Sequence, residues 1–340
     1  MNKLRFALCK SASILLLFVL LAACGAASTK SSDASSGEQQ NAAAAEVPQA
    51  FKTYTDFQGR KTEIPVYPRR IAVVAGSGAI LDVKELGFEP VGYPHRYMSN
   101  SAILKSVHES LSAKAPDLGM PTNLEQLVEL QPELTIMGYE TQDNEYDMLK
   151  KIGPLAAFDE SVPLQKRLTE IGEILGKQAE AKAILSELED KTKAMWQQLR
   201  SQGKIAEGET AAVVVYYWNK SMYLMKNFGV FDLINNPMGF KMSEKVASLS
   251  PSSGSPYIEI TEEALHDTLI ADRLFLLYAN NAEAKEGFKQ LKQSKIFQSL
   301  PPVKNGKTHY IPLEYNDSDL ITTRKLIEVF PRILETETFE

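Results

Sequence analysis

The side chains best suited to chemistry in this chain are aromatic, cationic and amide residues that follow predicted strands. Arginine offers a fork of N–H donors that fits oxygen-rich ligands, while tyrosine and tryptophan combine an apolar face with a polar tip. The candidate ligand-binding residues are His95, Arg96, Tyr97, Tyr139, Tyr217, Trp218, Asn219, Tyr315 and Asn316. We expect Arg96 and Trp218 to be the strongest contacts, whereas several of the aromatic residues also fit a half-buried core position.

Direct coordination of a metal ion is not indicated. A protein site for zinc or manganese needs several histidines and carboxylates that converge, and a helix often presents two histidines at a short, regular spacing. The histidines of this chain are scattered without an HxH or HxxxH pattern, at positions His95, His108, His266 and His309. The sequence therefore predicts no metal site built from the protein's own side chains.

The sequence also argues against catalysis. The turn Gly76-Ser77-Gly78 follows a predicted strand, as a phosphate loop or a nucleophile elbow would. However, Leu81 stands where a GxGxxG motif begun at Gly76 needs its last glycine, and no GxSxG motif occurs. We expect no enzyme activity and no cofactor, and we interpret the turn as one that opens a helix in a ligand cleft.

Strands and helices must position these residues, and they alternate in two regions of the chain. Units of this kind predict a sheet with helices on both of its faces. The predicted strands are 70–75, 90–93, 133–137, 152–157, 211–217, 272–278 and 309–311, and a small hairpin is expected over 54–64. Predicted helices include 79–86, 124–130, 260–265, 282–292 and 323–334. The fold class is therefore α/β, with two lobes.

A long helical segment separates the two regions. Residues 164–200 are rich in alanine, leucine, glutamate, lysine and glutamine, which are strong helix formers. A helix from about Gln178 to Gln202 would be nearly 40 Å long and would act as a stiff connector. We expect an N-terminal lobe over 50–176, a connector over 177–204 and a C-terminal lobe over 205–340, with the ligand in the cleft between the lobes.

The first residues carry an export signal. Three basic residues precede a short apolar run, and Leu21-Ala22-Ala23-Cys24 resembles the lipobox of bacterial lipoproteins. Residues 1–23 are expected to be removed as a signal peptide, with Cys24 lipidated and residues 24–49 forming a flexible tether. This places the protein at the extracytoplasmic face of the cell membrane, most naturally on a Gram-positive surface, where it is held by its palmitoyl-type anchor alone.

Composition excludes several other classes. The formal net charge is −6, and removal of residues 1–23, which carry three basic residues and no acidic one, would lower it to −9. Nucleic-acid binding needs clustered basic residues and is not expected. The two cysteines are Cys9, which would leave with the signal, and Cys24, so the folded part has neither a disulfide nor a catalytic thiol.

Several segments resemble the substrate-binding lipoproteins that deliver ferric siderophores, haem or cobalamin to ABC importers. These segments are Arg70–Val74, Glu85–Gly92, Asn123–Leu134, Tyr257–Leu265 and Pro302–Lys307. The family usually has Pro-Asp where this chain has Pro132-Glu133. The resemblance implies two Rossmann-like lobes on one connector helix, as in class III periplasmic binding proteins. It also implies a monomer whose partners are an ABC permease dimer and its ATPase.

The resemblance assigns a role to two glutamates. In this family a glutamate on each lobe docks onto arginines of the permease, and the matching positions here are Glu125 and Glu263. Surface glutamates near helix N-termini are also common for purely structural reasons.

The leading interpretation is a membrane-anchored binding protein that captures a ferric siderophore, with a slight preference for a hydroxamate. The alternative within the family is a haem- or cobalamin-binding protein, and the alternative outside it is a tethered extracytoplasmic α/β hydrolase.

Overall fold

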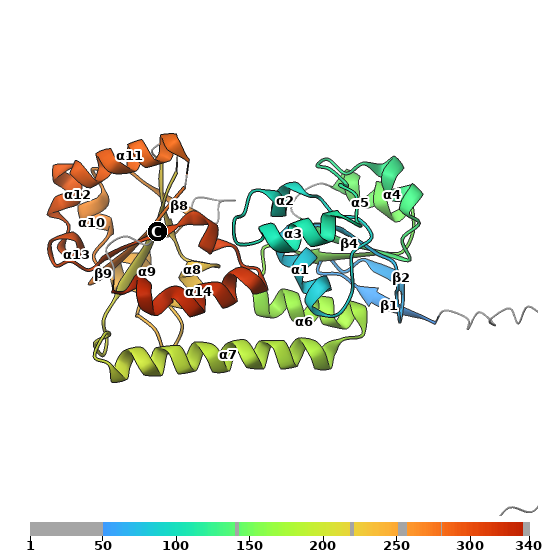
Figure 1. The fold of residues 1–340 in the computed structure, drawn as a ribbon, viewed down its shortest axis with the longest axis horizontal. Helices are drawn as coiled ribbons and strands as arrows, with labels where there is room; N and C mark the ends of the chain where they lie inside the picture. The colour runs from blue at the N-terminus through green and yellow to red at the C-terminus, as the bar shows by residue number, and fades with distance from the viewer. Residues whose placement is uncertain (1–49, 140–142, 218–220, 251–256, 280, 336–340) are drawn as a thin grey trace, which may run out of the picture. The chain divides into compact units, whose positions relative to one another are not determined.

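The computed structural model describes residues 50–335, except for 140–142, 218–220, 251–256 and 280. The predicted signal peptide, the predicted lipidation site Cys24 and the predicted tether lie outside the described residues. Figure 1 shows two α/β lobes, with helix α7 running beneath both of them. The α/β class predicted from the sequence is confirmed by this arrangement.

The N-terminal lobe contains two small sheets and six helices among its described residues. Its strands are β1 (Phe51–Thr55), β2 (Lys61–Pro65), β3 (Ile71–Val74), β4 (Leu134–Tyr139) and β5 (Leu155–Asp159). Its helices are α1 (Ser77–Glu85), α2 (Arg96–Ser99), α3 (Lys105–Ser112), α4 (Leu124–Leu130), α5 (Asp143–Lys150) and α6 (Leu164–Leu175). Strands β1 and β2 form the antiparallel hairpin that the sequence predicts.

The central sheet of this lobe is parallel and buried on both faces. Its strands follow the order β3-β4-β5. Successive residues of β3 pack alternately into two different apolar clusters: Ile71 and Val73 into one, Ala72 and Val74 into the other. This is why the strand reads as a continuous apolar run, since a parallel sheet covered on both faces has no polar side.

The C-terminal lobe is built around one mixed sheet. Its strands are β6 (Ala211–Tyr216), β7 (Met222–Met225), β8 (Tyr257–Ile260), β9 (Arg273–Tyr278) and β10 (Thr308–Pro312). Its helices are α8 (Val230–Ile234), α9 (Glu244–Ser248), α10 (Leu265–Thr268), α11 (Ala282–Gln293), α12 (Lys295–Ser299), α13 (Pro301–Lys304), the short 3-10 turn η1 (Leu313–Asn316) and α14 (Leu320–Ile333).

Three strands of this sheet match the prediction, and two were not predicted. The order is β10-β9-β6-β7-β8; β10, β9 and β6 are parallel, whereas β7 and β8 are antiparallel to their neighbours. Both of these additional strands have only four residues, so their periodicity is too short to distinguish from a loop. The predicted helix over 260–265 is also wrong at its start, because residues up to Ile260 belong to β8.

One predicted strand of the N-terminal lobe is nearly absent. Residues 90–93 make only isolated bridges, from Gly92 to Ala72 and from Tyr93 to Asp117. Pro90 and Pro94 enclose this segment, and proline has no N–H to donate to a strand partner. The segment still pairs briefly with β3, because the Val91 N–H donates to the Ile71 oxygen and the Val73 N–H donates to the Gly92 oxygen, but it is too short to continue the sheet as a regular strand.

The connector is a single helix, α7 (Gln178–Ser201), of 24 residues. At 1.5 Å per residue it is about 36 Å long. Its buried side chains recur along one side, at Ala181, Leu188, Met195, Trp196 and Leu199. Within the described ranges, none of the helices combines the length and the apolar content that crossing a membrane requires.

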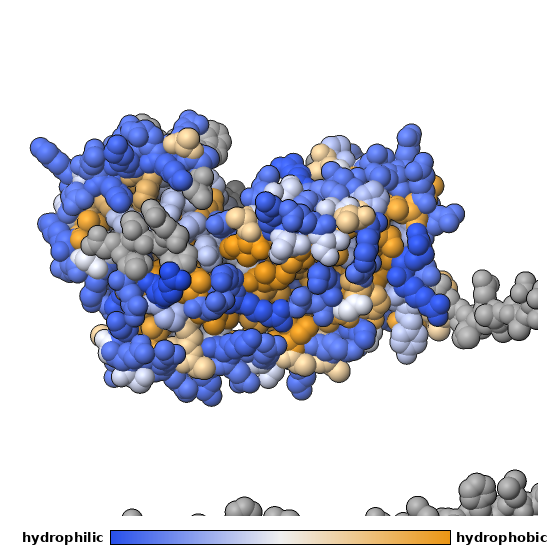
Figure 2. Space-filling model, viewed as in Figure 1, coloured by the Kyte–Doolittle hydropathy of each residue, from blue (hydrophilic) through white to orange (hydrophobic). Residues whose placement is uncertain are grey.

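The two lobes share one hydrophobic core. A single apolar cluster includes β3 and β4 of the N-terminal lobe, β6 and β9 of the C-terminal lobe, and the buried faces of α7 and α14. Figure 2 shows apolar side chains gathered between α14 and α1, above the connector. Movement of one lobe against the other must therefore disturb a packed interior in addition to bending a helix.

A buried ion pair lies where the lobes meet. Arg167 of α6 donates from Nε to Oδ2 of Asp82 in α1 at 2.7 Å, and its Nη2 donates to the backbone oxygen of Ser318 in the other lobe at 2.8 Å. The side chains of Arg167 and Asp82 are only 5% and 0% exposed. Burial raises the pKa of Asp82 to about 6, although the Arg167 guanidinium acts in the opposite direction.

Replacing Arg167 by methionine should lower the free energy of unfolding by about 3–5 kcal/mol, because Asp82 is then buried without its counter-charge. The pKa of Asp82 should rise further, so the folded state binds a proton more tightly than the unfolded chain does. The loss of stability should therefore be smallest near about pH 5 and should grow as the pH rises. Urea unfolding at several pH values measures both effects.

The matched control is Arg324→Met. Arg324 also joins the lobes, through Glu85 at 2.6 Å, but these side chains are 28% and 21% exposed. This variant should cost only about 0–1 kcal/mol. Equal losses of unfolding free energy in the two variants would contradict a larger contribution of the buried pair to stability.

Candidate ligand-binding cleft

A pocket lies at the carboxyl ends of the strands of the N-terminal lobe. Its floor is formed by Val74, the last residue of β3, with Ala75 after it, and by Met137 and Gly138 near the end of β4. It encloses about 100 Å³. The remaining lining residues come from α2, the 119–122 loop, α5 and the end of β5; they are Pro94, Tyr97, Gly119, Met120, Thr122, Glu145 and Glu160. Ligands of open α/β sheets bind at this edge, where loops leave the strands.

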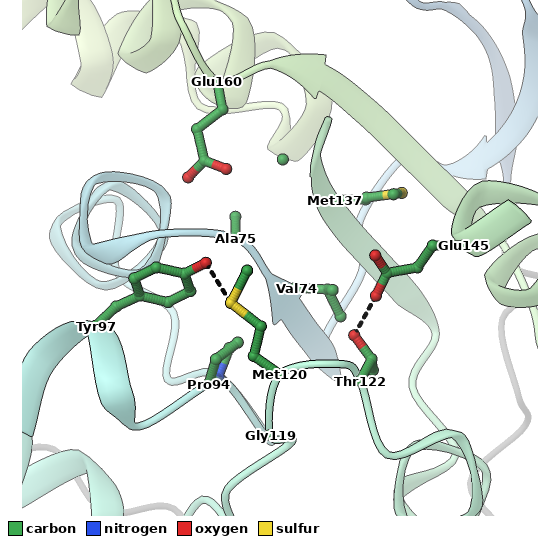
Figure 3. A pocket seen from close by; sticks show the side chains of 11 residues that line it. Val74, Ala75, Pro94, Tyr97, Gly119, Met120, Thr122, Met137, Glu145 and Glu160 are labelled. Carbon is green, nitrogen blue, oxygen red and sulfur yellow. Dashed lines mark hydrogen bonds between the residues drawn. The ribbon is translucent and has the colours of Figure 1, made fainter. Parts of the chain in front are cut away.

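Glu160 projects into this pocket from the end of β5, as Figure 3 shows. The backbone N–H of Gly76 donates a hydrogen bond to its Oε1 atom. A Cβ atom at Gly76 would lie 2.6 Å from this oxygen, and a Cβ at Gly138 would overlap the other one. Two glycines, one in the turn after β3 and one in β4, therefore leave room for one carboxylate.

Helix α2 supplies one rim of the pocket. The Tyr97 hydroxyl donates to the sulfur of Met120 at 2.8 Å. Arg96 is exposed and lies beside them, with Nη1 at 3.8 Å from the same sulfur and its guanidinium carbon 5.8 Å from the centre of the Tyr97 ring. Figure 3 shows Tyr97 and Met120 together at this rim, and Thr122 opposite them donating to Glu145 at 2.5 Å.

The C-terminal lobe presents a cluster of aromatic rings. Tyr217 lies 5.6 Å from Tyr223, and Tyr257 lies 5.9 Å from Tyr223 and 5.8 Å from Phe228, measured between ring centres. All four rings are half-buried. Burial is the largest cause that raises the pKa of Tyr257, to about 12, and its hydroxyl is hydrogen bonded to that of Tyr217. These hydroxyls are therefore neutral donors and acceptors at physiological pH.

The pocket and the aromatic cluster flank the contact between the lobes. Gly76 and Gly78 open helix α1, and a Cβ at Gly78 would lie 2.6 Å from the Arg167 guanidinium. Arg167 reaches the Ser318 backbone oxygen, and the Ser318 hydroxyl accepts from the N–H of Gly229, which follows Phe228. The Arg167–Ser318 contact thus connects the turn that binds Glu160 to the loop that carries Phe228, one ring of the aromatic cluster.

Asp317 stands next to this contact and is exposed. Although the residue as a whole is exposed, neighbouring atoms partly desolvate its carboxyl group, and this desolvation, with repulsion from Asp319 and Glu314, raises its pKa to about 6. Its charge also contributes to the raised pKa of Tyr257, so the two side chains are close enough to interact electrostatically. Asp317 is one of the cleft residues, with Glu160, Met120 and Tyr257, that sequence reasoning did not single out.

The structure brings some of the predicted ligand residues together. Arg96 and Tyr97 lie at the rim of the pocket, and Tyr217 belongs to the aromatic cluster. Trp218 and Asn219 lie outside the described residues. Tyr139 is the last residue of β4, and its side chain is not among the described parts of the structure.

Other predicted residues make their described contacts within their own lobe. Nε2 of His95 lies 2.9 Å from the backbone oxygen of Ala115, and its ring packs against those of Tyr93 and His108. Tyr315 and Asn316 are buried, and Oδ1 of Asn316 accepts from the N–H of Val230 at 3.1 Å. Their contacts support neighbouring elements, so a direct role in binding a ligand stays a prediction for these three residues.

The two glutamates expected to dock onto a permease are both exposed. Glu125 lies in the first turn of α4, after Asn123, which caps that helix by accepting from the N–H of Gln126. Glu263 lies in the turn before α10, where its own backbone N–H and the Thr261 hydroxyl lower the pKa of its carboxyl. Among the described residues, no group of three histidine, cysteine, aspartate or glutamate side chains is placed to hold a metal ion.

Comparison with known proteins identifies the class of this chain. The periplasmic binding protein family matches residues 80–315, so the chain belongs to that family. This confirms both the resemblance drawn from the sequence and the two-lobed fold that it implied. The family consists of binding components and not of enzymes, so the hydrolase alternative is set aside.

Relatives and solved structures agree with this assignment. In Bacillus subtilis, the probable siderophore-binding lipoprotein YfiY is 26% identical over 270 residues, covering 76% of this chain and 80% of YfiY. The iron(3+)-hydroxamate-binding protein YxeB is 22% identical over 288 residues, covering 83% and 85%. The FhuD protein from S. pseudintermedius has a TM-score of 0.70 at 21% identity, with 84% of this chain and 98% of FhuD covered. Staphylococcus aureus SirA, solved with staphyloferrin B, has the same TM-score and coverages at 24% identity. At sequence identities of 21% and 24%, the similarity to these two structures establishes only the fold of this chain.

The geometry around Glu160 can be tested without a ligand. Gly138→Ala should lower the free energy of unfolding by about 1–3 kcal/mol, because the new methyl group meets the Glu160 carboxylate and lies 2.9 Å from the Ala75 Cβ. In a Glu160→Ala background the same change should cost at least about 0.5 kcal/mol less, which a double-mutant cycle measures by chemical unfolding.

Gly153→Ala is the matched control. A Cβ at Gly153 meets only the Pro132 backbone oxygen, at 3.8 Å. This change should be neutral or should stabilise the protein by about 0.4–1 kcal/mol. Purely additive costs at positions 138 and 160 would show that the glycine does not make room for the glutamate.

Proposed function

We propose that this protein is the substrate-binding component of an ABC importer and that it captures a ferric siderophore, preferably a hydroxamate, in the cleft between its lobes. The observation that supports this best is the composition of the cleft. A pocket with the exposed Arg96 at its rim and, across the contact between the lobes, a cluster of aromatic rings with neutral hydroxyls would together suit a bulky chelate with an oxygen-rich rim. The names of the relatives YfiY and YxeB point to the same ligand class.

The proposal includes a lipid anchor and a permease. Cys24 would carry the lipid, and residues 24–49 would tether the folded part near its importer at the outer face of the membrane. A monomer would then dock through Glu125 and Glu263, whose exposed carboxylates suit the planar guanidinium groups of arginine. ATP would be hydrolysed by the partner ATPase and not by this chain.

Ligand capture should be visible in the intrinsic fluorescence of the protein. Titration with a ferric hydroxamate should quench the tyrosine and tryptophan emission, with half-saturation at micromolar concentration or below. Tyr217→Ala should weaken binding about tenfold, because aromatic side chains at the centre of a site supply much of the binding free energy. Ferric catecholate and haem are titrated in parallel to identify the ligand class.

Tyr67→Ala provides the control for the loss of an aromatic ring. Tyr67 is 75% exposed and lies in the segment between β2 and β3, away from the pocket lining. Its replacement should leave the affinity unchanged. Absence of quenching by any of these iron compounds at micromolar concentration would exclude the siderophore proposal, and quenching by haem alone would favour the haem alternative.

Docking is tested separately from binding. Glu125→Ala combined with Glu263→Ala should abolish iron uptake by cells, while the purified variant keeps the affinity of the unchanged protein for its chelate. Charge pairs at such a surface act mainly on orientation and association with the partner. The control is Glu109→Ala combined with Glu244→Ala, which removes one exposed glutamate from each lobe on the other helices α3 and α9 and should leave uptake intact. Loss of chelate binding in the first variant would refute the docking role.

A further inference from the structure

A backbone N–H and two glycines fix the position of the Glu160 carboxylate in the pocket. Its Oε1 atom accepts the N–H of Gly76 at the start of α1, and its Oε2 atom lies over Gly138. Any larger residue at either glycine would collide with this carboxylate. The side chain is half-buried, so it is held in place and still open to the pocket.

The charges around Glu160 are unevenly distributed. Glu145 is the other charged residue that lines the pocket, and it accepts a hydrogen bond from Thr122. Arg96 lies at the rim, directed towards Met120. On the other side of the contact between the lobes, the exposed side chain next to the aromatic cluster is Asp317, another carboxylate. Among the described residues, the pocket is thus lined by two carboxylates, Glu145 and Glu160, with a single arginine at its rim.

We propose that Glu160 selects ligands by their charge. It favours ferric chelates that carry a protonated amine and disfavours polyanionic chelates such as ferric tris-catecholates. An ammonium group can form a short, charge-assisted hydrogen bond with the carboxylate. A polyanion would place like charges together in a partly desolvated site, which is an effective way to reject a competitor. This inference rests on the proposed siderophore-binding function.

The test is Glu160→Gln, which keeps the shape of the side chain and an oxygen that can accept the Gly76 N–H. Dissociation constants are measured by fluorescence at neutral pH and about 0.15 M salt. The probes are ferrioxamine B, which carries an ammonium group, ferrichrome, which is neutral, and the trianion ferric enterobactin. The variant should bind ferrioxamine B about tenfold more weakly, ferrichrome with less than about threefold change, and ferric enterobactin about tenfold more tightly. Binding of ferric enterobactin by the variant alone would support the proposal equally.

Glu129→Gln is the control, because it changes the net charge by the same amount on an exposed face of α4. It should alter none of the three affinities by more than about twofold, and thermal unfolding verifies that both variants are folded. If the unchanged protein binds none of the three chelates, the proposed function fails and this inference fails with it. If it binds them but Glu160→Gln shifts all affinities equally, or none, only the role of Glu160 is refuted.

Discussion

The contact between the lobes is the constraint on which the rest of this structure depends. Arg167 is buried with Asp82 inside one lobe and donates to the Ser318 backbone oxygen of the other. Around this polar contact, α7 and α14 join the cores of both lobes into one apolar cluster. Moving a buried guanidinium away from its partners costs free energy, because its charge then stays in the interior without a counter-charge or acceptor. The lobes are therefore expected to shift only slightly when a ligand binds.

This constraint also determines how the cleft is built. The turn that begins at Gly76 has two functions, because its first N–H binds Glu160 and its third residue, Gly78, makes room for Arg167. The pocket carboxylate and the contact between the lobes are consequently positioned by the same three residues. A site held in this way is largely preformed, which reduces the entropy lost when a ligand binds.

The sequence predicts the parallel strands and the connector helix well, because each depends on local information. A strand buried on both faces reads as a β-branched run, and a long helix reads as a stripe of apolar residues. The edge strands β7 and β8 were missed since four residues show little periodicity. Glu160 was missed for a different reason: nothing in its neighbouring sequence reveals that two distant glycines leave space for it.

The segment His95-Arg96-Tyr97 shows most clearly why residue type alone does not define a binding site. The three residues are adjacent at the start of α2, where consecutive side chains point in directions about 100° apart. His95 consequently faces Ala115 and His108, Tyr97 lines the pocket, and Arg96 remains exposed at its rim. The residue types predicted a basic and aromatic site. In the structure, however, the His95 side chain points away from the pocket, and the Glu160 carboxylate projects into it. The electrostatic character of the cleft thus follows from helix geometry and glycine placement, and neither is visible in the types of the neighbouring residues.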